Sequence, residues 1–359
     1  MAGPEHARRR RGGRRGNRLV DRDPGRSQRA SRRVRGHGRR EPRRVGRDPD
    51  GGSARPLGLL ASSRRDGLRQ ASGRGWRPAV RVAIVQFGPV LGRLQPNLDI
   101  VIAAAAEAAA AGARLLVAPE MCLTGWTLRD DAVRHRLANE VEEIALPTLR
   151  GAAAAHGLAI LVGGPILADA PPGPGFSLAN AAVLLQGNGE RIDYLKMHLF
   201  GEERAWWSSG SGTRVGLVDG ARVGLTICYD AEFPEVPRMT RLAGAEILAI
   251  PATNMTPYEH DQDVIFATRA IENECPVLVA NRIGSEGQWS YFGRSVIVDQ
   301  RGQIVAQAGT TEELLVADIA PGGPADPALS YMAQRRPELY GLLAEPLSDA
   351  RDDRAAPST

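Results

Sequence analysis

The sequence predicts an α/β protein in which helices pack over buried strands. Short apolar segments rich in β-branched residues alternate with helical segments, and RVAIVQF at 81–87 is one such strand-like segment. A unit of helix, glycine and strand also occurs three times, in NLDIVIAAAAEAAAAGARLLVAPE (97–120), AAAAHGLAILVGGP (152–165) and RMTRLAGAEILAIPA (238–252). Because this unit recurs in both halves of the chain, we expect two sheets related by a pseudo-twofold axis.

Turn residues define the remaining elements. Gly112 and Gly244 are expected to end the helices of the first and third units, because glycine adopts the left-handed conformation of a helix cap without strain. The segments GNG (187–189) and DQRG (299–302) are typical of hairpin turns, so we expect a pair of strands around each. Beyond about residue 320 we expect a C-terminal extension that contains an amphipathic helix, YMAQRRPELYGLL (331–343).

The charge divides the chain into a basic segment and an acidic body. Residues 1–78 hold 24 Arg against 7 Asp and Glu, whereas residues 79–359 hold 22 Lys and Arg against 34 Asp and Glu. The basic segment is rich in Arg, Gly, Ser and Pro and has little to bury, so we expect disorder there. We expect one folded domain over 79–345 and a flexible tail over 346–359.

Two interpretations of the basic segment stay open. It is either an arm that binds nucleic acid or an upstream reading frame joined by an early start codon, with Val80 as the true first residue. In both cases the acidic body argues against a nucleic-acid-binding core, because contacts to phosphates dominate that affinity. We therefore expect nucleic acid as a partner only if the segment is translated.

Cysteine and histidine usage excludes several classes of protein. Cys122, Cys228 and Cys275 lie far apart without a CxxC pair, which favours reduced thiols in the cytoplasm over disulfides or a zinc site. The six histidines form no HExxH-like motif, so we expect neither a metal nor another cofactor. No apolar run approaches the ~20 residues that a membrane helix needs, and we expect no membrane association.

Reactive side chains follow three of the expected strands. Glu120 follows one strand, Lys196 a second and Cys228 a third, and the carboxyl ends of strands are where α/β proteins build their sites. Cys228 stands on a strand–turn–helix elbow, where free backbone N–H groups predict a lowered thiol pKa. Each residue also has a structural interpretation, with Cys228 as a small buried side chain and Glu120 as a helix cap or salt-bridge partner. We interpret Cys122 and Cys275 as packing residues.

Lys196 is the single lysine among 46 lysines and arginines. A compact ammonium can lie beside a thiolate and a developing oxyanion, where a planar guanidinium does not fit. The alternative is that this arginine-rich composition has left one lysine behind by chance. Glu203, seven residues further on, is positioned to pair with Lys196.

The three reactive residues lie in motifs that resemble those of the nitrilase (carbon–nitrogen hydrolase) superfamily. APEMCLTGW (118–126) is similar to its Glu motif, YLKMHLFGEE (194–203) to its Lys motif and ICYDAEFPE (227–235) to its Cys motif, in the family's order. The resemblance covers roughly residues 80–343. It implies a four-layer αββα sandwich, a homodimer or higher homo-oligomer, a small-molecule amide substrate and no cofactor.

The resemblance also implies a role for each residue. Cys228 would attack the amide carbon to give a thioester, and Glu120 would carry protons. Lys196 and the backbone N–H of Tyr229 would hold the oxyanion. Glu203, rather than its neighbour Glu202, matches the glutamate that orients the lysine. Five further side chains are assigned to the substrate pocket by position, although packing or an ion pair explains them equally well: Trp126, Trp206, Trp207, Glu232 and Asn254.

The residues after the cysteine favour one branch of the superfamily. Tyr229 and Asp230 resemble the amidases, and CYDxEFPE resembles 5-aminopentanamidase and stereoselective aliphatic amidases. A carboxylate at Glu232 would repel an acidic substrate and favour an amine. The leading hypothesis is therefore a thiol amidohydrolase for small neutral or cationic amides. Hydrolysis of N-carbamoyl amines, a nitrilase activity and a catalytically inactive binding protein with this fold remain the alternatives.

Overall fold

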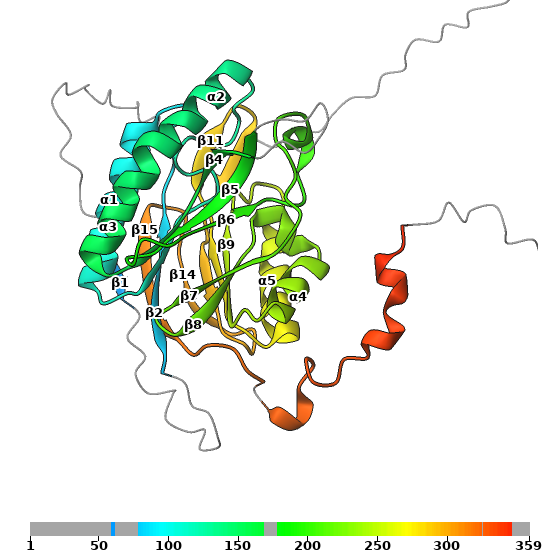
Figure 1. Ribbon diagram of the computed structural model, residues 1–359. Helices are drawn as coiled ribbons and strands as arrows, with labels where there is room; N and C mark the ends of the chain where they lie inside the picture. Colours follow the sequence, from blue (N-terminus) through cyan, green and yellow to red (C-terminus); the bar gives the residue numbers. More distant parts are fainter. Residues whose placement is uncertain (1–58, 62–77, 169–177, 325, 347–359) are drawn as a thin grey trace, which may run out of the picture. The chain divides into compact units, whose positions relative to one another are not determined.

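A computed structural model describes residues 59–61, 78–168, 178–324 and 326–346 (Figure 1). All of them belong to the second of the chain's two units, 53–359. Within these residues the strands form two large sheets and one hairpin. The seven-stranded sheet has the order β1 (Leu59–Ala61), β15 (Glu313–Ile319), β2 (Val80–Gln86), β3 (Leu115–Val117), β4 (Ala159–Leu167), β5 (Leu178–Leu185) and β6 (Arg191–Leu195).

The second sheet has six described strands. Their order is β14 (Ile304–Gln307), β13 (Val296–Val298), β10 (Val277–Ala280), β9 (Ile247–Pro251), β8 (Ala221–Leu225) and β7 (Arg214–Val218). A separate antiparallel hairpin consists of β11 (Ile283–Glu286) and β12 (Trp289–Phe292). The inner strands of both sheets are parallel, and antiparallel strands complete the edges.

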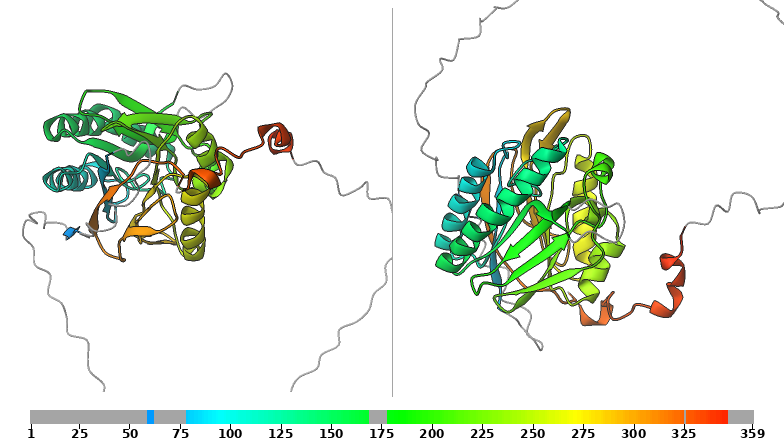
Figure 2. Two further views of the ribbon diagram at one scale, coloured as in Figure 1. Left: turned by 90° about the horizontal axis from the view of Figure 1, so that it is seen from below. Right: turned by 45° about the horizontal axis from the view of Figure 1, so that its top comes forward.

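Five α-helices of the described chain cover the outer faces of the two sheets (Figures 1 and 2). They are α1 (Leu94–Ala110), α2 (Asp131–Glu140), α3 (Leu146–His156), α4 (Glu235–Leu242) and α5 (Glu259–Asn273). One turn of π-helix, Val141–Ala145, joins α2 to α3. The first three helices lie on the seven-stranded sheet, and α4 and α5 pack on β8, β9, β10 and β13. The predicted αββα sandwich is thus confirmed.

Alternation along β2 shows how the sequence specifies these layers. Val82 and Ile84 face the second sheet in the central core, whereas Ala83 and Val85 face the helices. A strand buried on both faces is apolar on both, which explains the uninterrupted apolar run VAIV at 82–85. The same reasoning applies to β3, β9 and β10.

The local predictions hold for the repeated units and hairpins. The units correspond to α1–β3, α3–β4 and α4–β9, and Gly112, Gly157 and Gly244 between them have positive φ angles. The two expected hairpins are the antiparallel pairs β5–β6 and β13–β14.

The predicted helix over 331–343 is wrong. This segment instead contains two short 3-10 turns, Pro337–Leu339 and Gly341–Ala344. Proline removes a backbone donor and interrupts a helix, and Leu339, Leu342 and Leu343 remain exposed rather than packed. Helical periodicity alone does not stabilise a segment that buries no apolar face.

The structure tests only part of what the sequence predicts for the two terminal segments. Within the segment expected to be disordered, Leu59–Ala61 form strand β1, which pairs in parallel with β15. The remainder of 1–77 and the expected flexible tail from 347 onward lie outside the described residues. Among the residues that are described, no helix is long and apolar enough to cross a membrane.

Candidate active site

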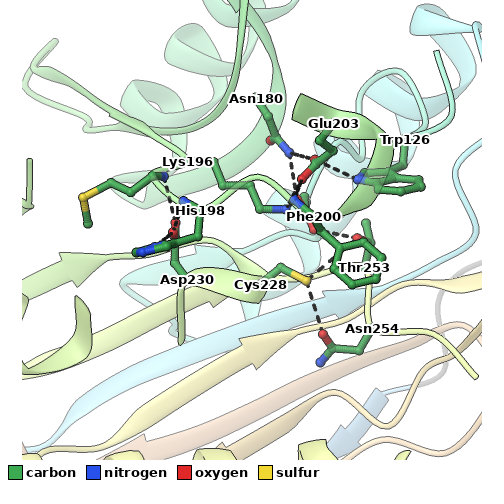
Figure 3. A network of polar contacts seen from close by, with 12 residues as sticks. Trp126, Asn180, Lys196, His198, Phe200, Glu203, Cys228, Asp230, Thr253 and Asn254 are labelled. Atoms are coloured by element: carbon green, nitrogen blue, oxygen red, sulfur yellow. Dashed lines mark hydrogen bonds and ion pairs between the residues drawn. The ribbon is translucent and has the colours of Figure 1, made fainter. Parts of the chain in front are cut away.

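The ends of three strands bring Glu120, Lys196 and Cys228 together in the interior, where Glu120 contacts Lys196 and Figure 3 shows Lys196 near Cys228. Glu120 follows β3, Lys196 follows β6 directly, and Cys228 lies three residues after β8 and begins the 3-10 turn Cys228–Glu232. Glu120 and Lys196 are fully buried, and Cys228 is 8% exposed. A cavity of ≈ 240 Å³ reaches both Lys196 and Cys228. The juxtaposition expected from the strand ends is therefore present.

The Lys196 ammonium lies between two carboxylates. Its Nζ donates to Glu120 Oε1 at 2.8 Å and to Glu203 Oε2 at 2.7 Å. Burial by itself would lower the pKa of Lys196, but Glu120, Glu203 and the Cys228 sulfur outweigh it and hold that pKa well above its ordinary value. Lys196 is consequently a permanent cation that faces the cavity.

Two further side chains complete this network. Asn180 Nδ2 donates to Glu120 Oε1 at 2.7 Å and to Glu203 Oε1 at 2.8 Å. Thr253 Oγ1 donates to Glu120 Oε2 at 2.6 Å, so both oxygens of Glu120 are held. The sequence analysis missed both residues. Asn180 is a lone amide in an otherwise apolar strand, β5, and that was the available signal; Thr253 follows β9 without a distinctive pattern.

Glu203 and Glu202 differ completely in environment. Glu203 is fully buried and accepts from Trp126 Nε1 at 2.9 Å and from the Phe200 backbone N–H at 2.8 Å, in addition to Lys196. Burial raises its pKa, partly offset by Lys196. Glu202 is exposed and pairs with Arg129. The geometry therefore agrees with the choice of Glu203 in the sequence.

Cys228 adopts a strained backbone conformation at the elbow. Its φ angle is 43°, in the left-handed region that non-glycine residues seldom occupy and that is common at functional sites. Its Sγ lies 3.3 Å from Asn254 Oδ1 and 3.9 Å from Thr253 Oγ1. The expected lowering of its pKa is wrong, because burial and the nearby Glu120 raise the pKa of the thiol well above its ordinary value despite Lys196. Cys228 therefore rests as a protonated thiol.

The other two cysteines lie in apolar surroundings, as predicted. Cys122 and Cys275 are both fully buried in the core clusters. Burial raises the pKa of each thiol to about 12. Neither lines the cavity.

Of the five side chains assigned to the pocket, the structure places three around the cavity. Trp126, Glu232 and Asn254 line it. Trp206 and Trp207 do not line it, and that part of the prediction is wrong. Trp207 is buried in the apolar cluster behind the cavity wall that also contains Trp126, and the guanidinium of Arg134 lies 5.8 Å from its ring centre. Adjacent tryptophans carry no sequence signal that separates pocket from packing.

Several lining residues come from segments that the sequence analysis did not single out. Tyr258 and Asp261 stand at the start of α5, and Phe266 lies further along this helix. Phe200 lies within the Lys motif but was not itself assigned to the pocket. Within the described residues no group of three histidine, cysteine or carboxylate side chains is arranged to hold a metal ion.

Comparison with known proteins is consistent with this geometry. The chain belongs to the carbon–nitrogen hydrolase family, whose model, "Carbon-nitrogen hydrolase", matches residues 81–323. It is 36% identical over 271 residues to "Hydrolase in pqqF 5'region" of Pseudomonas protegens, covering 74% of this chain and 92% of that protein. It is 31% identical to an (R)-stereoselective amidase of Pseudomonas sp., covering 74% and 95% of the two chains.

Solved structures give the same result. An amidase from Nesterenkonia sp. superposes with a TM-score of 0.64 and 31% identity, covering 75% of this chain and 98% of that chain. A variant of the Nesterenkonia sp. AN1 amidase, also at 31% identity and a TM-score of 0.64, was solved with butyramide; the match covers 73% of this chain and 96% of that chain. The protein is thus a hydrolase of carbon–nitrogen bonds, on the amidase branch of the nitrilase superfamily.

Proposed function

We propose that this protein hydrolyses small primary amides to a carboxylic acid and ammonia through a thioester on Cys228. One observation carries the proposal: a buried network of Glu120, Lys196 and Glu203 lies beside a strained cysteine at the inner end of a cavity. Perturbed titratable groups that converge on a cavity are typical of catalytic sites.

Acylation begins with attack of Cys228 Sγ on the amide carbon. Because the resting sulfur carries its proton, a base must accept that proton, and Glu120 is the carboxylate whose charge acts most strongly on the Cys228 thiol. The carbonyl oxygen becomes an oxyanion, which the Lys196 ammonium and the backbone N–H of Tyr229 stabilise. The tetrahedral intermediate then collapses: the C–N bond breaks, Glu120 returns the proton to nitrogen, and ammonia leaves.

Deacylation uses the same groups in the same order. Glu120 takes a proton from water, the resulting hydroxyl attacks the thioester carbon, and the oxyanion again faces Lys196. Collapse breaks the C–S bond, and the proton on Glu120 returns to Cys228 as the acid leaves. Glu203, fixed by Trp126 and Phe200, keeps the ammonium of Lys196 oriented through both half-reactions.

Two carboxylates favour a cationic group at the distal end of the substrate. Glu232 and Asp261 both line the cavity and are also open to solvent, so they lie toward its mouth. Neither carboxylate has a hydrogen-bonding or ion-pair partner in the described part of the chain. Burial and the neighbouring Asp261 charge raise the pKa of Glu232, and an ammonium bound between the two would relieve that repulsion.

The apolar part of the cavity suits the acyl chain. The rings of Trp126, Phe200, Tyr229 and Tyr258 line it and would contact an aliphatic or cyclic group between the amide and the amine. The amidase names of the relatives and the butyramide complex of the Nesterenkonia sp. AN1 amidase support amides of this size. An N-carbamoyl diamine would also present a distal ammonium to Glu232 and Asp261, which makes it the second candidate.

The test is ammonia release by the purified full-length chain. The panel contains 5-aminopentanamide, its neutral analogue pentanamide, a piperidinecarboxamide, glutarate monoamide, N-carbamoylputrescine and an aliphatic nitrile. We expect turnover of the first three and a loss of at least ~10³-fold in Cys228→Ala. Asp261→Asn and Glu232→Gln should raise KM about tenfold or more for 5-aminopentanamide and leave pentanamide unchanged.

A matched control distinguishes the loss of a carboxylate in the cavity from the loss of the same charge elsewhere on α5. Asp263→Asn removes the same charge from α5 outside the cavity, where the carboxylate pairs with Arg294, and should leave both KM values unchanged. Turnover of only N-carbamoylputrescine or only the nitrile would retain the mechanism and replace the substrate. Turnover that persists in Cys228→Ala would refute the thioester.

Three further proposals follow from the family resemblance. The catalytic domain spans 79–345, the protein works in the cytoplasm, and it assembles as a homodimer or a higher homo-oligomer. The family match over 81–323 supports the first of these.

A further inference from the structure

Asp230 is a buried carboxylate two residues after Cys228, and the proposed mechanism does not use it. It lies in the 3-10 turn that begins at Cys228 and is fully buried. A buried carboxylate is retained only where hydrogen bonds or charges replace its hydration. The partners of Asp230 therefore indicate what it does.

In the described chain, this carboxylate forms its hydrogen bonds with the segment around Lys196, as Figure 3 shows for Asp230 and His198. Oδ2 accepts from the Tyr194 hydroxyl at 2.8 Å and from the Met197 N–H at 3.3 Å. Oδ1 accepts from the His198 N–H at 2.7 Å and faces His198 Nδ1 at 3.0 Å. One carboxylate in the nucleophile's turn thus holds residues on both sides of Lys196.

The chain after Lys196 needs such an anchor because β6 ends at Leu195 and no regular structure follows until residue 201. The Lys196 backbone is itself fixed by bonds to the Asn180 carbonyl and from the Gly210 N–H. The His198 ring also stacks on Phe233, just beyond the cysteine turn, with ring centres 3.9 Å apart. The two loops therefore behave as one joined unit.

We infer that Asp230 is a positioning residue that sets the Lys196 ammonium relative to the Cys228 sulfur. The inference rests on the proposed function, because the distance that matters is the one between the sulfur and the charge that stabilises the oxyanion. The bonds to Asn180 and Gly210 fix the Lys196 backbone to its own neighbours, whereas Asp230 ties the residues on both sides of Lys196 to the turn that carries the nucleophile. Misplacement of a catalytic group by about 1 Å costs up to about 10²-fold in rate.

Asparagine at this position provides the sharpest test. Four donors converge on two carboxylate oxygens, whereas an amide offers one oxygen and an NH₂ group that faces the remaining donors. Asp230→Asn must therefore release either the Met197 side or the His198 side of the contact. Since the side chain keeps its size, loss of packing does not confuse the result.

In Asp230→Asn we expect kcat for the best amide substrate to fall between about 10- and 100-fold with KM within threefold. Hydrogen exchange of the backbone amides in residues 196–200 should become about tenfold faster. Glu313→Gln is the matched control, since Glu313 is another buried carboxylate that accepts a backbone N–H, from Gly309 at 2.7 Å, outside the cavity. Its kcat and its exchange at 196–200 should stay within twofold of the wild type.

The outcomes separate this inference from the proposed function. A wild-type kcat or unchanged exchange at 196–200 in Asp230→Asn would overturn the inference. If the wild type hydrolyses no amide, the proposed function fails, and the exchange measurement still decides the positioning role. If Asp230→Asn does not fold, Tyr194→Phe removes one contact only; a threefold to tenfold lower kcat at constant KM is expected there, and full activity with unchanged exchange would refute the inference.

Discussion

The ammonium of Lys196 has a geometry that arginine cannot reproduce. Three N–H donors radiate from one point, and two of them reach Glu120 and Glu203, which approach from different elements. The side chain is 1% exposed, and Glu120 and Glu203 both contact its ammonium, so a longer and wider head group must either crowd these carboxylates or enter the cavity. A guanidinium presents its donors in a plane and suits one bidentate carboxylate rather than two separate ones.

Lys196→Arg should therefore keep the fold and lose turnover. We expect kcat to decrease at least ~10²-fold, because the displaced charge no longer faces the oxyanion. Overpacking of a closed site should also lower the free energy of unfolding by about 1–3 kcal/mol. Steady-state kinetics and urea unfolding measure the two effects. Arg129→Lys, at the exposed ion pair with Glu202, is the control and should change neither. Near wild-type activity in Lys196→Arg would contradict the role given to Lys196.

For individual residues, the sequence predicted which reactive side chains come together, but it did not predict the surroundings that set their pKa values. Glu120, Lys196 and Cys228 were singled out because reactive side chains directly after strands stand out, and Glu203 because of its spacing from Lys196 and the resemblance to the family's Lys motif. The direction of the Cys228 pKa shift was wrong, because the elbow suggested free N–H groups while Glu120 and burial dominate. Such a balance depends on distances between residues far apart in the chain.

Close contact between elements places Glu120, the proposed proton carrier. Gly163 in β4 lies against the turn after β3, and a Cβ added there would lie 2.5 Å from the Pro119 carbonyl oxygen and 2.6 Å from Met121 N. Only glycine permits this approach. The next residue, Gly164, faces the other side of the sheet, where an added Cβ would find its nearest neighbour, Leu123 Cδ1, at 3.4 Å.

Gly163→Ala should displace the backbone that carries Glu120. We expect kcat to fall about tenfold or more and the free energy of unfolding to fall by about 1–3 kcal/mol, since a backbone, unlike a flexible side chain, cannot yield without moving the strand. Gly164→Ala makes the same chemical change on the same strand and should leave kcat within twofold. Equal kcat values for the two variants would show that the close approach does not position Glu120.

Elements were predictable where local and tertiary preferences agree. Helix–glycine–strand units and hairpins carry their own signals, and the two layers of sheet follow from strands apolar on both faces. The helix expected over 331–343 failed because its apolar residues find no surface in the described chain. The pocket could not be assembled from sequence, because Tyr258 and Asp261 on α5 meet Trp126 from more than 130 positions away only after folding.

For the molecule as a whole, the buried acid–base groups set its response to alkaline pH. Cys122 lies in the core between helices and sheet, and Cys275 lies in the core around the second sheet. Burial raises the pKa of each thiol from 9.0 to about 12. Burial also raises the pKa values of Tyr194 and Tyr291, and both burial and Glu120 raise that of Cys228. The chain has one lysine, so few surface amines titrate in the same range.

The sign of the effect follows from proton binding. In this range the folded state holds the thiol protons more tightly than the unfolded chain does, so the free energy of unfolding is level below about pH 9 and falls as the pH rises from 9 toward 12. Each of the two core thiols contributes about 1.4 kcal/mol per pH unit in that window, or about 2 kcal/mol each by pH 10.5.

Urea unfolding at pH 8 and pH 10.5 measures this decrease in the free energy of unfolding. The double variant Cys122→Ala/Cys275→Ala loses the same packing at both pH values, so the loss of packing cancels when the two are compared. Its free energy of unfolding should therefore decrease between pH 8 and pH 10.5 by about 4 kcal/mol less than that of the wild type, because the two thiols no longer titrate. The same drop in both proteins would mean that these thiols ionise freely in the folded state, and that the two cores admit water where the structure places apolar contacts.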